Sequence, residues 1–370
     1  MASSRPLRLR LIAALAAVLV VTGTTLATTS VGSSATSRPT AIVAIGDSFA
    51  SGEGAGSYDT ATDRRGNFCH RSSASPINRT AIPGIDARIS LGCSGATTNH
   101  VKLGGAPRYG EAPQAERLRP IARNYQVKMI VLTVGLNNVG FANLVIDCIR
   151  AYLWLGPRCQ ESWANRLPIS LRDSAPKIAE NIDDIRTVMR EAGYADHDYQ
   201  FVVQSYTSPF AADNRYWLSK MGHGCPIRND DAKWGRDNAV PQITATIGQV
   251  AADAGVRFLD LGPSMHGREA CANGVNSHAE EWANGIYIDV DQFKNGIGEN
   301  LVSQGAHPNA QGYAQIARCL SDFYRMTTRN GRCARGSDGN LATVAIPEEQ
   351  AVTPRIFPKI EEPPPPEAQD

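Results

Sequence analysis

Two residues far apart in the chain could together perform acyl transfer. Ser48 follows the apolar run 41–45 and a Gly-Asp pair, and a glycine-rich stretch comes next. His307 lies in an Ala-His-Pro-Asn segment directly before the last helical pattern. A serine set at a strand end and a histidine on a loop are the nucleophile and general base of acyl-transfer sites. Because a serine after Gly-Asp is most often only a turn residue, neither residue alone predicts a function.

Two further segments could supply hydrogen-bond donors to such a site. The segments 91–98 and 134–141 follow two apolar runs and contain Gly95 and Asn137. Gly95 has no side chain, so its N–H can approach a substrate closely, and Asn137 offers an amide donor. With the N–H of Ser48 they could form an oxyanion hole, in which each donor contributes ~3 kcal/mol of transition-state stabilisation. The alternative is that both residues only form turns.

Five short apolar runs predict strands, and patterns with a three- to four-residue spacing between them predict helices. The predicted strands are 41–45, 87–91, 129–134, 200–204 and 256–261; the predicted helices are 174–192, 240–254 and 308–324. Nearly continuous apolar strands alternating with helices favour a parallel sheet buried on both faces. We therefore expect an α/β fold, a three-layer sandwich, with Ser48 at the carboxyl end of the first strand.

The composition is that of a soluble globular protein with a sizeable core. The chain has 370 residues, 42% of them hydrophobic and 20% charged, and a formal net charge of +1. This balance predicts no nucleic-acid or anionic-membrane partner.

The two ends of the chain differ from the middle. Three arginines precede an apolar run over 11–26 and small residues up to Ala35. This layout predicts a signal peptide over 1–35 and a secreted protein. A membrane anchor is disfavoured because the apolar run is at or below the ~20 residues that a spanning helix needs. At the other end, 341–370 is rich in Pro and Glu and predicts a disordered tail. The domain between them is 36–340.

Eight cysteines in a secreted chain indicate disulfide bonds. They are Cys69, Cys93, Cys148, Cys159, Cys225, Cys271, Cys319 and Cys333. Of the 105 possible pairings, joining neighbours in chain order is the simplest. A metal site is the alternative, but the sequence has no CxxC pair and no HExxH motif, so we predict no metal.

Four segments in chain order resemble the SGNH family of hydrolases, also called GDSL esterases and lipases. They are Gly46-Asp47-Ser48-Phe49, Cys93-Ser94-Gly95-Ala96, Gly135-Leu136-Asn137-Asn138 and His307-Pro308-Asn309-Ala310-Gln311-Gly312. The wider strings are similar to the secreted, disulfide-bonded actinobacterial branch, over about 40–325. The resemblance implies a flavodoxin-like α/β/α fold with a parallel five-stranded sheet, sequential disulfides, and Ser48, Gly95, Asn137 and His307 as the site.

Two positions depart from the family pattern. The family usually has Asp three residues before the histidine, where this chain has Gln304. Some members use a backbone carbonyl instead, so we expect the carbonyl of Gln304 or Gly305 to accept from the His307 ring, giving a Ser-His dyad. Asp289 or Asp291 is the alternative. The third segment usually ends in Asp, and here Asn138 keeps the shape without the charge.

The resemblance implies ester hydrolysis through an acyl-enzyme. His307 takes the proton of Ser48, which attacks a carboxylic ester of a lipid or small molecule, and water releases the acid. We predict a secreted monomeric esterase or lipase with no cofactor and with transient contact to a lipid interface. A carbohydrate deacetylase on the same fold and an inactive binding protein are the alternatives. Trp217, Trp234 and Trp282 could line an acyl or sugar site or pack as core, whereas the other six histidines are expected to be structural.

Overall fold

The computed structural model describes residues 38–216, 219–220, 222–286 and 304–347. The predicted signal peptide, Trp217, Asp289, Asp291 and residues 348–370 of the predicted tail lie outside these ranges. No helix in the described part of the chain is long and apolar enough to cross a membrane.

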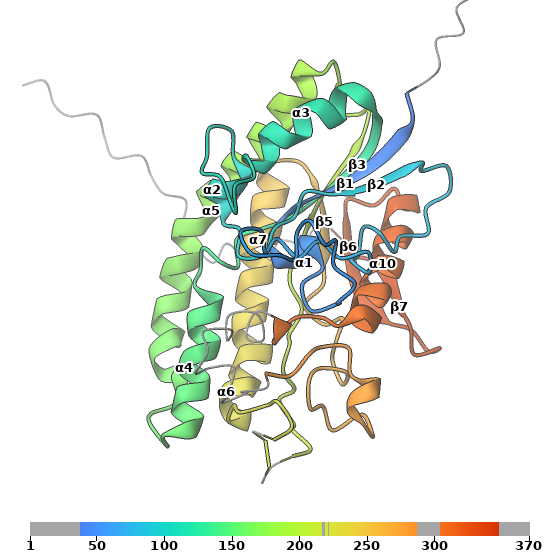
Figure 1. The fold of residues 1–370 in the computed structure, drawn as a ribbon. Helices are drawn as coiled ribbons and strands as arrows, with labels where there is room; N and C mark the ends of the chain where they lie inside the picture. Colours follow the sequence, from blue (N-terminus) through green and yellow to red (C-terminus); the bar gives the residue numbers. More distant parts are fainter. Residues whose placement is uncertain (1–37, 217–218, 221, 287–303, 348–370) are drawn as a thin grey trace, which may run out of the picture. The chain divides into compact units, whose positions relative to one another are not determined.

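A single mostly parallel sheet forms the centre of the domain (Figure 1). Its strand order is β2-β1-β3-β4-β5-β6-β7, and only the pair β6–β7 is antiparallel. The strands are β1 (Thr40–Gly46), β2 (Ala87–Ser90), β3 (Gln126–Thr133), β4 (Gln200–Gln204), β5 (Arg257–Asp260), β6 (Asn330–Arg335) and β7 (Leu341–Ala345). β1 and β3 are buried on both faces, which explains their continuous Val, Ile and Leu sequences.

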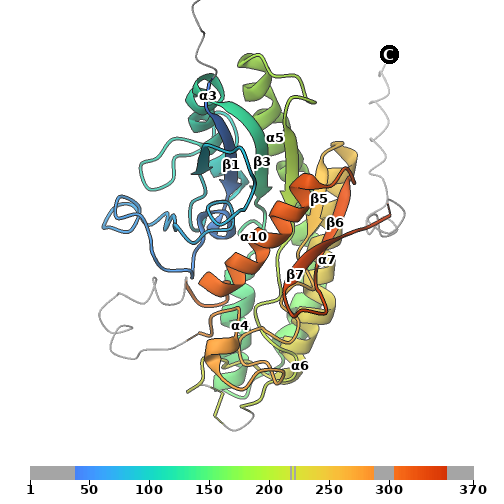
Figure 2. The same ribbon diagram turned by 90° about the vertical axis from the view of Figure 1, so that its right-hand side faces the viewer.

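Helices cover both faces of the sheet. On one face α5 (Cys159–Glu191) contacts both α3 (Gln114–Asn124) and α7 (Val240–Asp253). On the other face α10 (Ala310–Arg325) packs on β6 and β7 (Figure 2). The remaining helices are α1 (Ser48–Ser51), α2 (Thr98–Val101), α4 (Phe141–Leu153), α6 (Asn229–Trp234) and the short turns η1 (Gly235–Ala239) and η2 (His278–Glu280). The three-layer α/β sandwich is therefore confirmed.

The sheet is larger than the sequence predicted. All five predicted strands are present, but β6 and β7 extend the sheet beyond β5. The predicted tail boundary at 341 is therefore wrong for its first residues, because Leu341–Ala345 pairs with β6. β7 was not predicted because its few apolar residues lie in a polar stretch of sequence. Burial of Leu341 beneath α10 stabilises this strand.

Four disulfides join neighbouring cysteines in chain order. The pairs are Cys69–Cys93, Cys148–Cys159, Cys225–Cys271 and Cys319–Cys333. This is the simplest pairing that the sequence suggested. The first bridge lies beside the candidate site, where it joins the segment after α1 to the segment after β2.

Candidate active site

Ser48 is the first residue of the short helix α1, at the carboxyl end of β1. Asp47 caps this helix by accepting a hydrogen bond from the N–H of Phe49 at 3.0 Å. At the first helical position the N–H of Ser48 has no acceptor within the helix, so it can be offered to a ligand. Because Ser48 is partly exposed while its neighbours on both sides are buried, the turn presents the serine hydroxyl at the surface of a rigid frame.

The turn into α1 is held by contacts from distant segments. The side-chain amide of Gln114 both accepts from the N–H and donates to the carbonyl of Gly46, each at 2.7 Å. Gly46 has φ +141°, and a Cβ there would lie 1.9 Å from the carbonyl oxygen of Thr133. The hydroxyl of Tyr206 donates to Asp47 at 2.5 Å. Asp47 therefore braces the turn, as expected from the sequence.

His307 lies within hydrogen-bond distance of the serine. Its Nε2 is 2.7 Å from Oγ of Ser48, and its Nδ1 is 3.1 Å from the carbonyl oxygen of Gly305. This places a base in position to take the serine proton, with the other ring nitrogen directed to a backbone acceptor.

The histidine loop is fixed by the segment that precedes the undescribed residues 287–303. The N–H of Asn284 donates to the carbonyl of His307 at 2.8 Å, and its carbonyl accepts from Ala306 at 3.0 Å. Asn309 caps α10 and donates to the carbonyl of Glu281 at 2.7 Å. The loop holding the imidazole is thus bound on both sides.

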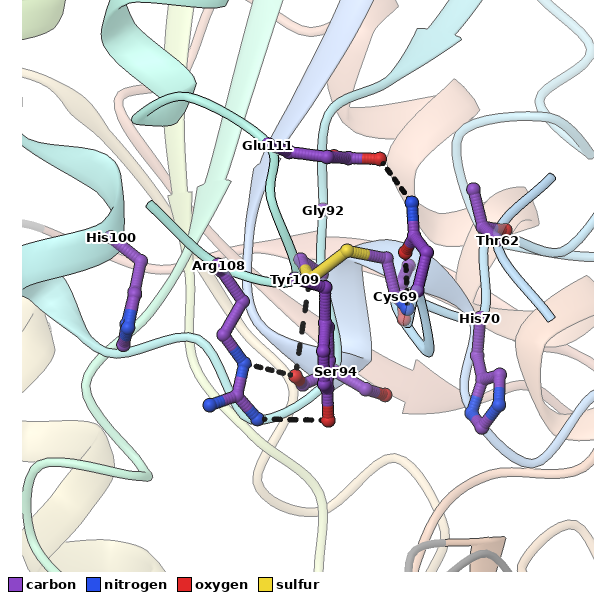
Figure 3. Close-up of a disulfide and its surroundings, with 12 residues drawn as sticks. Thr62, Cys69, His70, Gly92, Ser94, His100, Arg108, Tyr109 and Glu111 are labelled. Carbon is purple, nitrogen blue, oxygen red and sulfur yellow. Dashed lines mark hydrogen bonds between the residues drawn. A yellow bond between two sulfur atoms is a disulfide. The ribbon is translucent and has the colours of Figure 1, made fainter. Parts of the chain in front are cut away.

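Gly95 lies in a tight turn, residues 93–96, that we call the oxyanion loop after the role predicted for Gly95; Figure 3 shows its neighbour Ser94 beside Arg108 and the Cys69–Cys93 disulfide. Gly95 has φ +71°, and a Cβ there would lie 2.2 Å from a guanidinium nitrogen of Arg108. Arg108 Nε donates to the carbonyl of Ser94 at 3.2 Å, and the N–H of Ser94 donates to Cys69 at 3.1 Å. The positive φ favours glycine at this position, which agrees with a backbone donor that approaches a ligand closely.

The segment after β3 contacts the oxyanion loop directly. Asn137 Nδ2 donates to the carbonyl of Ala96 at 2.8 Å, which uses one of its two amide hydrogens. Asn138 accepts from the N–H of Thr98 at 3.0 Å and donates to its hydroxyl at 2.9 Å. Asn138 therefore makes its contacts through hydrogen bonds that need no charge, and the hydrogen bond to Ala96 leaves the second amide hydrogen of Asn137 able to donate elsewhere.

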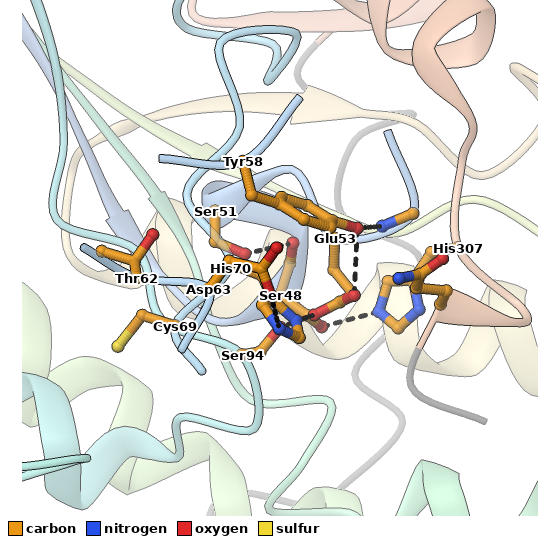
Figure 4. Close-up of polar contacts among 12 residues, drawn as sticks. Ser48, Ser51, Glu53, Tyr58, Thr62, Asp63, Cys69, His70, Ser94 and His307 are labelled. Atoms are coloured by element: carbon orange, nitrogen blue, oxygen red, sulfur yellow. Dashed lines mark hydrogen bonds and ion pairs between the residues drawn. The ribbon is translucent and has the colours of Figure 1, made fainter. Parts of the chain in front are cut away.

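A buried polar cluster behind Ser48 was not predicted. It contains Glu53, His70, Tyr58 and Ser94 (Figure 4). Glu53 accepts from Tyr58 at 3.2 Å, contacts His70 Nδ1 at 2.6 Å and accepts from the hydroxyl of Ser94. The contact with Glu53 fits the expectation from the sequence that His70 is structural. Nothing in the sequence pointed to Glu53 as its partner except its place as an acidic residue between two glycines, Gly52 and Gly54.

Trp282 and Trp234 differ in their surroundings. Trp282 is buried under α10, its backbone carbonyl accepting from Asn309 at 2.9 Å. Trp234 lines an apolar cavity of about 50 Å³ with Phe141 and Phe210. The surroundings of these two tryptophans therefore do not identify a substrate.

Comparison with known proteins gives consistent matches. Residues 44–315 match the model of the GDSL-like lipase/acylhydrolase family. The chain is 25% identical over 281 residues to a lipase of Streptomyces rimosus, covering 75% of this chain and 86% of that one. It is 24% identical over 309 residues to Lipase 1 of Streptomyces coelicolor, covering 82% and 94%. The solved structure of phospholipase A1 from Streptomyces albidoflavus superposes with a TM-score of 0.52 at 19% identity, covering 75% and 95%.

Proposed function

The chain belongs to the GDSL-like lipase/acylhydrolase family and is a carboxylic ester hydrolase, and we propose that it cleaves acyl esters through Ser48 and His307 by an acyl-enzyme. The observation that carries this mechanism is the 2.7 Å contact between Ser48 Oγ and His307 Nε2. The four disulfides and the N-terminal sequence support secretion. We propose that the protein acts as an extracellular monomer that touches lipid interfaces transiently.

The steps follow from the site geometry. His307 removes the proton of Ser48 as the serine oxygen attacks the ester carbonyl. The N–H groups of Ser48 and Gly95 and the amide of Asn137 bind the oxyanion. His307 then protonates the departing alcohol, and a water deprotonated by His307 hydrolyses the acyl-enzyme. The reaction needs no redox step.

Labelling with a fluorophosphonate tests the nucleophile. Folded mature protein should be labelled and should hydrolyse p-nitrophenyl esters from acetate to palmitate, and Ser48→Ala should lose the label and at least about 10⁴-fold in kcat. Ser51→Ala is the matched control, because Ser51 is fully buried in the same helix. Folded wild type that takes no label and hydrolyses no ester would favour the binding-protein alternative.

The dyad needs its own test. If the Gly305 carbonyl is the orienting acceptor, Asp289→Asn and Asp291→Asn should each keep kcat within about threefold. A carboxylate that orients a catalytic histidine is worth about 10⁴-fold in kcat. A loss of that size in either variant would replace the dyad by a triad and leave Ser48 and His307 in their roles.

A further inference from the structure

One fully buried carboxylate beside the nucleophile has no part in the steps above. Glu53 is 0% exposed and follows α1 by two residues. Its side chain is contacted by His70 Nδ1 at 2.6 Å, the Tyr58 hydroxyl at 3.2 Å and the Ser94 hydroxyl. Burying a charge is costly unless it is paired and hydrogen-bonded, so a carboxylate held in this way is expected to serve the structure or the reaction.

The backbone around Glu53 joins the segments that carry the site. Its N–H donates to the carbonyl of Ser48 at 2.9 Å, and its carbonyl accepts from the Tyr313 hydroxyl of α10 at 3.0 Å. The next residue, Gly54, lies against the histidine loop, since a Cβ there would be 2.9 Å from Cβ of His307. Through Ser94 the side chain also reaches the oxyanion loop. Glu53 and the adjacent Gly54 thus contact all three parts of the site; Figure 4 shows Glu53 beside Ser48, Ser94 and His307.

The cluster holds Glu53 in its ionised form. Burial alone raises the pKa of this carboxyl, but the hydrogen bond from His70, the charge of His307 and the Ser94 hydroxyl together lower it below the ordinary value. Burial lowers the pKa of His70, but Glu53 and Asp63, which lies 3.4 Å from His70 Nε2, outweigh it and raise that pKa. Glu53 is therefore a carboxylate at neutral pH, and Glu53 and Asp63 favour the protonated form of His70.

We propose that Glu53 is a positioning residue for ester hydrolysis, holding the oxyanion loop through Ser94 and supplying a fixed negative charge to the catalytic histidine. This inference rests on the proposed roles of Ser48 and His307. When His307 takes the proton of Ser48 it becomes an imidazolium, and a buried carboxylate nearby stabilises that cation. When His307 passes the proton to the leaving alcohol, the imidazole is neutral again and Glu53 is unchanged.

The charged and titratable groups on each side are few in the described part of the chain. Glu53 faces His70 and Tyr58 from its own segment, Ser94 from the oxyanion loop and Tyr313 from α10, and Asp63 lies beyond His70. Asp47 acts electrostatically on Tyr313 from the other end of α1.

Glu53→Gln tests the proposal, because it keeps the shape and removes the charge. We expect kcat to fall about 10-fold or more with little change in KM, since the charge acts after substrate is bound. We also expect the pKa of His307 to fall by about 1 unit, so that the acid limb of kcat/KM moves to lower pH. Glu111→Gln is the matched control: Glu111 is also held by hydrogen bonds, from Asn67, Arg71 and Arg117, and within the described residues its side chain has no hydrogen bond to Ser48, Ser94 or His307.

An NMR titration separates the charge from the fold. The pKa of His307 is followed in both variants and in wild type, with its signal assigned by loss in His307→Gln among only seven histidines. If Glu53→Gln does not fold, Glu53→Gln with His70→Gln removes both charges together, which leaves no buried ion unpaired. The His307 pKa should still fall. A folded variant with reduced kcat but unchanged His307 pKa, or with wild-type kcat, overturns the role of the charge.

Ser94→Ala tests the link to the oxyanion loop. It should lower kcat several-fold while leaving the His307 pKa at its wild-type value. An unchanged kcat would overturn that part of the proposal. Wild type without esterase activity would instead contradict the proposed function, a result that the NMR titration does not depend on.

Discussion

Two buried carboxyl groups flank α1, and their pKa values are shifted in opposite directions. Asp47 before the helix is 1% exposed, and burial raises its pKa to about 7 despite hydrogen bonds from Tyr206 and Phe49. Glu53 after the helix is equally buried, yet its pKa is lowered, because the hydrogen bond from His70, the charge of His307 and the hydrogen bond from Ser94 outweigh burial. The difference between the two ends therefore comes from the partners. A hydroxyl and a backbone amide offset only part of the desolvation of Asp47, whereas the histidines and Ser94 more than offset that of Glu53.

The two ends also hold Ser48 in place differently. On the Asp47 side, the turn is fixed by the backbone of Gly46 and by Gln114, which need no charge. On the Glu53 side, the loops are joined by an ion pair whose strength depends on pH. The comparison predicts that substitutions of Gly46 act through steric fit, whereas substitutions in the Glu53–His70 pair act through electrostatics.

The largest effect is expected at the uncharged end. Gly46→Ala places a Cβ 1.9 Å from the carbonyl oxygen of Thr133, at φ +141°. The backbone clash and the strained φ should together lower the free energy of unfolding by about 4 kcal/mol. Gly56→Ala is the control, since its φ is +66° but nothing lies within 4 Å of its Cβ, and it should lose about 1 kcal/mol. Equal losses in chemical denaturation would show that steric fit does not hold this turn.

An intermediate effect is expected at the charged end. His70→Gln leaves Glu53 without its cation and should cost about 3 kcal/mol near pH 6. The pKa of His70 is raised on folding, so its stabilisation is complete below the unfolded value of about 6.5 and is lost as the pH rises through the folded pKa. The loss in His70→Gln should therefore be smaller at pH 9 than at pH 5. His197→Gln, whose side chain is 88% exposed, is the control. A loss independent of pH would mean that His70 acts by packing alone.

The sequence predicted the parts of the site that occupy strand ends, and missed those assembled by long-range contacts. Ser48, Gly95 and Asn137 each follow an apolar run, so their place at one edge of a parallel sheet could be expected. Glu53 meets Ser94 across 41 residues, and Tyr206 meets Asp47 across 159, without any local pattern that marks either pair. Side-chain contacts of this kind depend on how loops fold back, which periodicity does not describe.

The same distinction holds for the fold. The first five strands were predicted from apolar runs, which are nearly continuous in β1 and β3. β6 and β7 were not predicted, because their sequences are half-polar. They form one end of the sheet with β7 at its edge, and one of their faces packs on α10 while the other tolerates polar residues. A strand that is buried on only one face has a weaker apolar pattern and is harder to predict from its sequence.

The smallest effect is expected from neutralising Asp47. This substitution should raise the free energy of unfolding, whereas His70→Gln should lower it. A carboxyl whose pKa is raised from 3.8 to about 7 on folding contributes stability that is complete below pH ~4 and lost as the pH rises through 7. Asp47→Asn has no such group, so it should be more stable than wild type above pH 8. At 1.36 kcal/mol per unit the shift is worth a few kcal/mol, and we expect about 2 kcal/mol of gain because the asparagine amide must leave one of its own hydrogen bonds unmade.

Asp260→Asn is the matched variant for this last comparison. Asp260 is 4% exposed but paired with Arg332 at 2.7 Å, so it resembles the Glu53 end and should lose stability at pH 8 instead of gaining it. Urea unfolding at pH 5 and pH 8 measures both variants. If Asp47→Asn and Asp260→Asn change stability in the same direction at pH 8, the presence of a cationic partner is not what separates the two ends of α1.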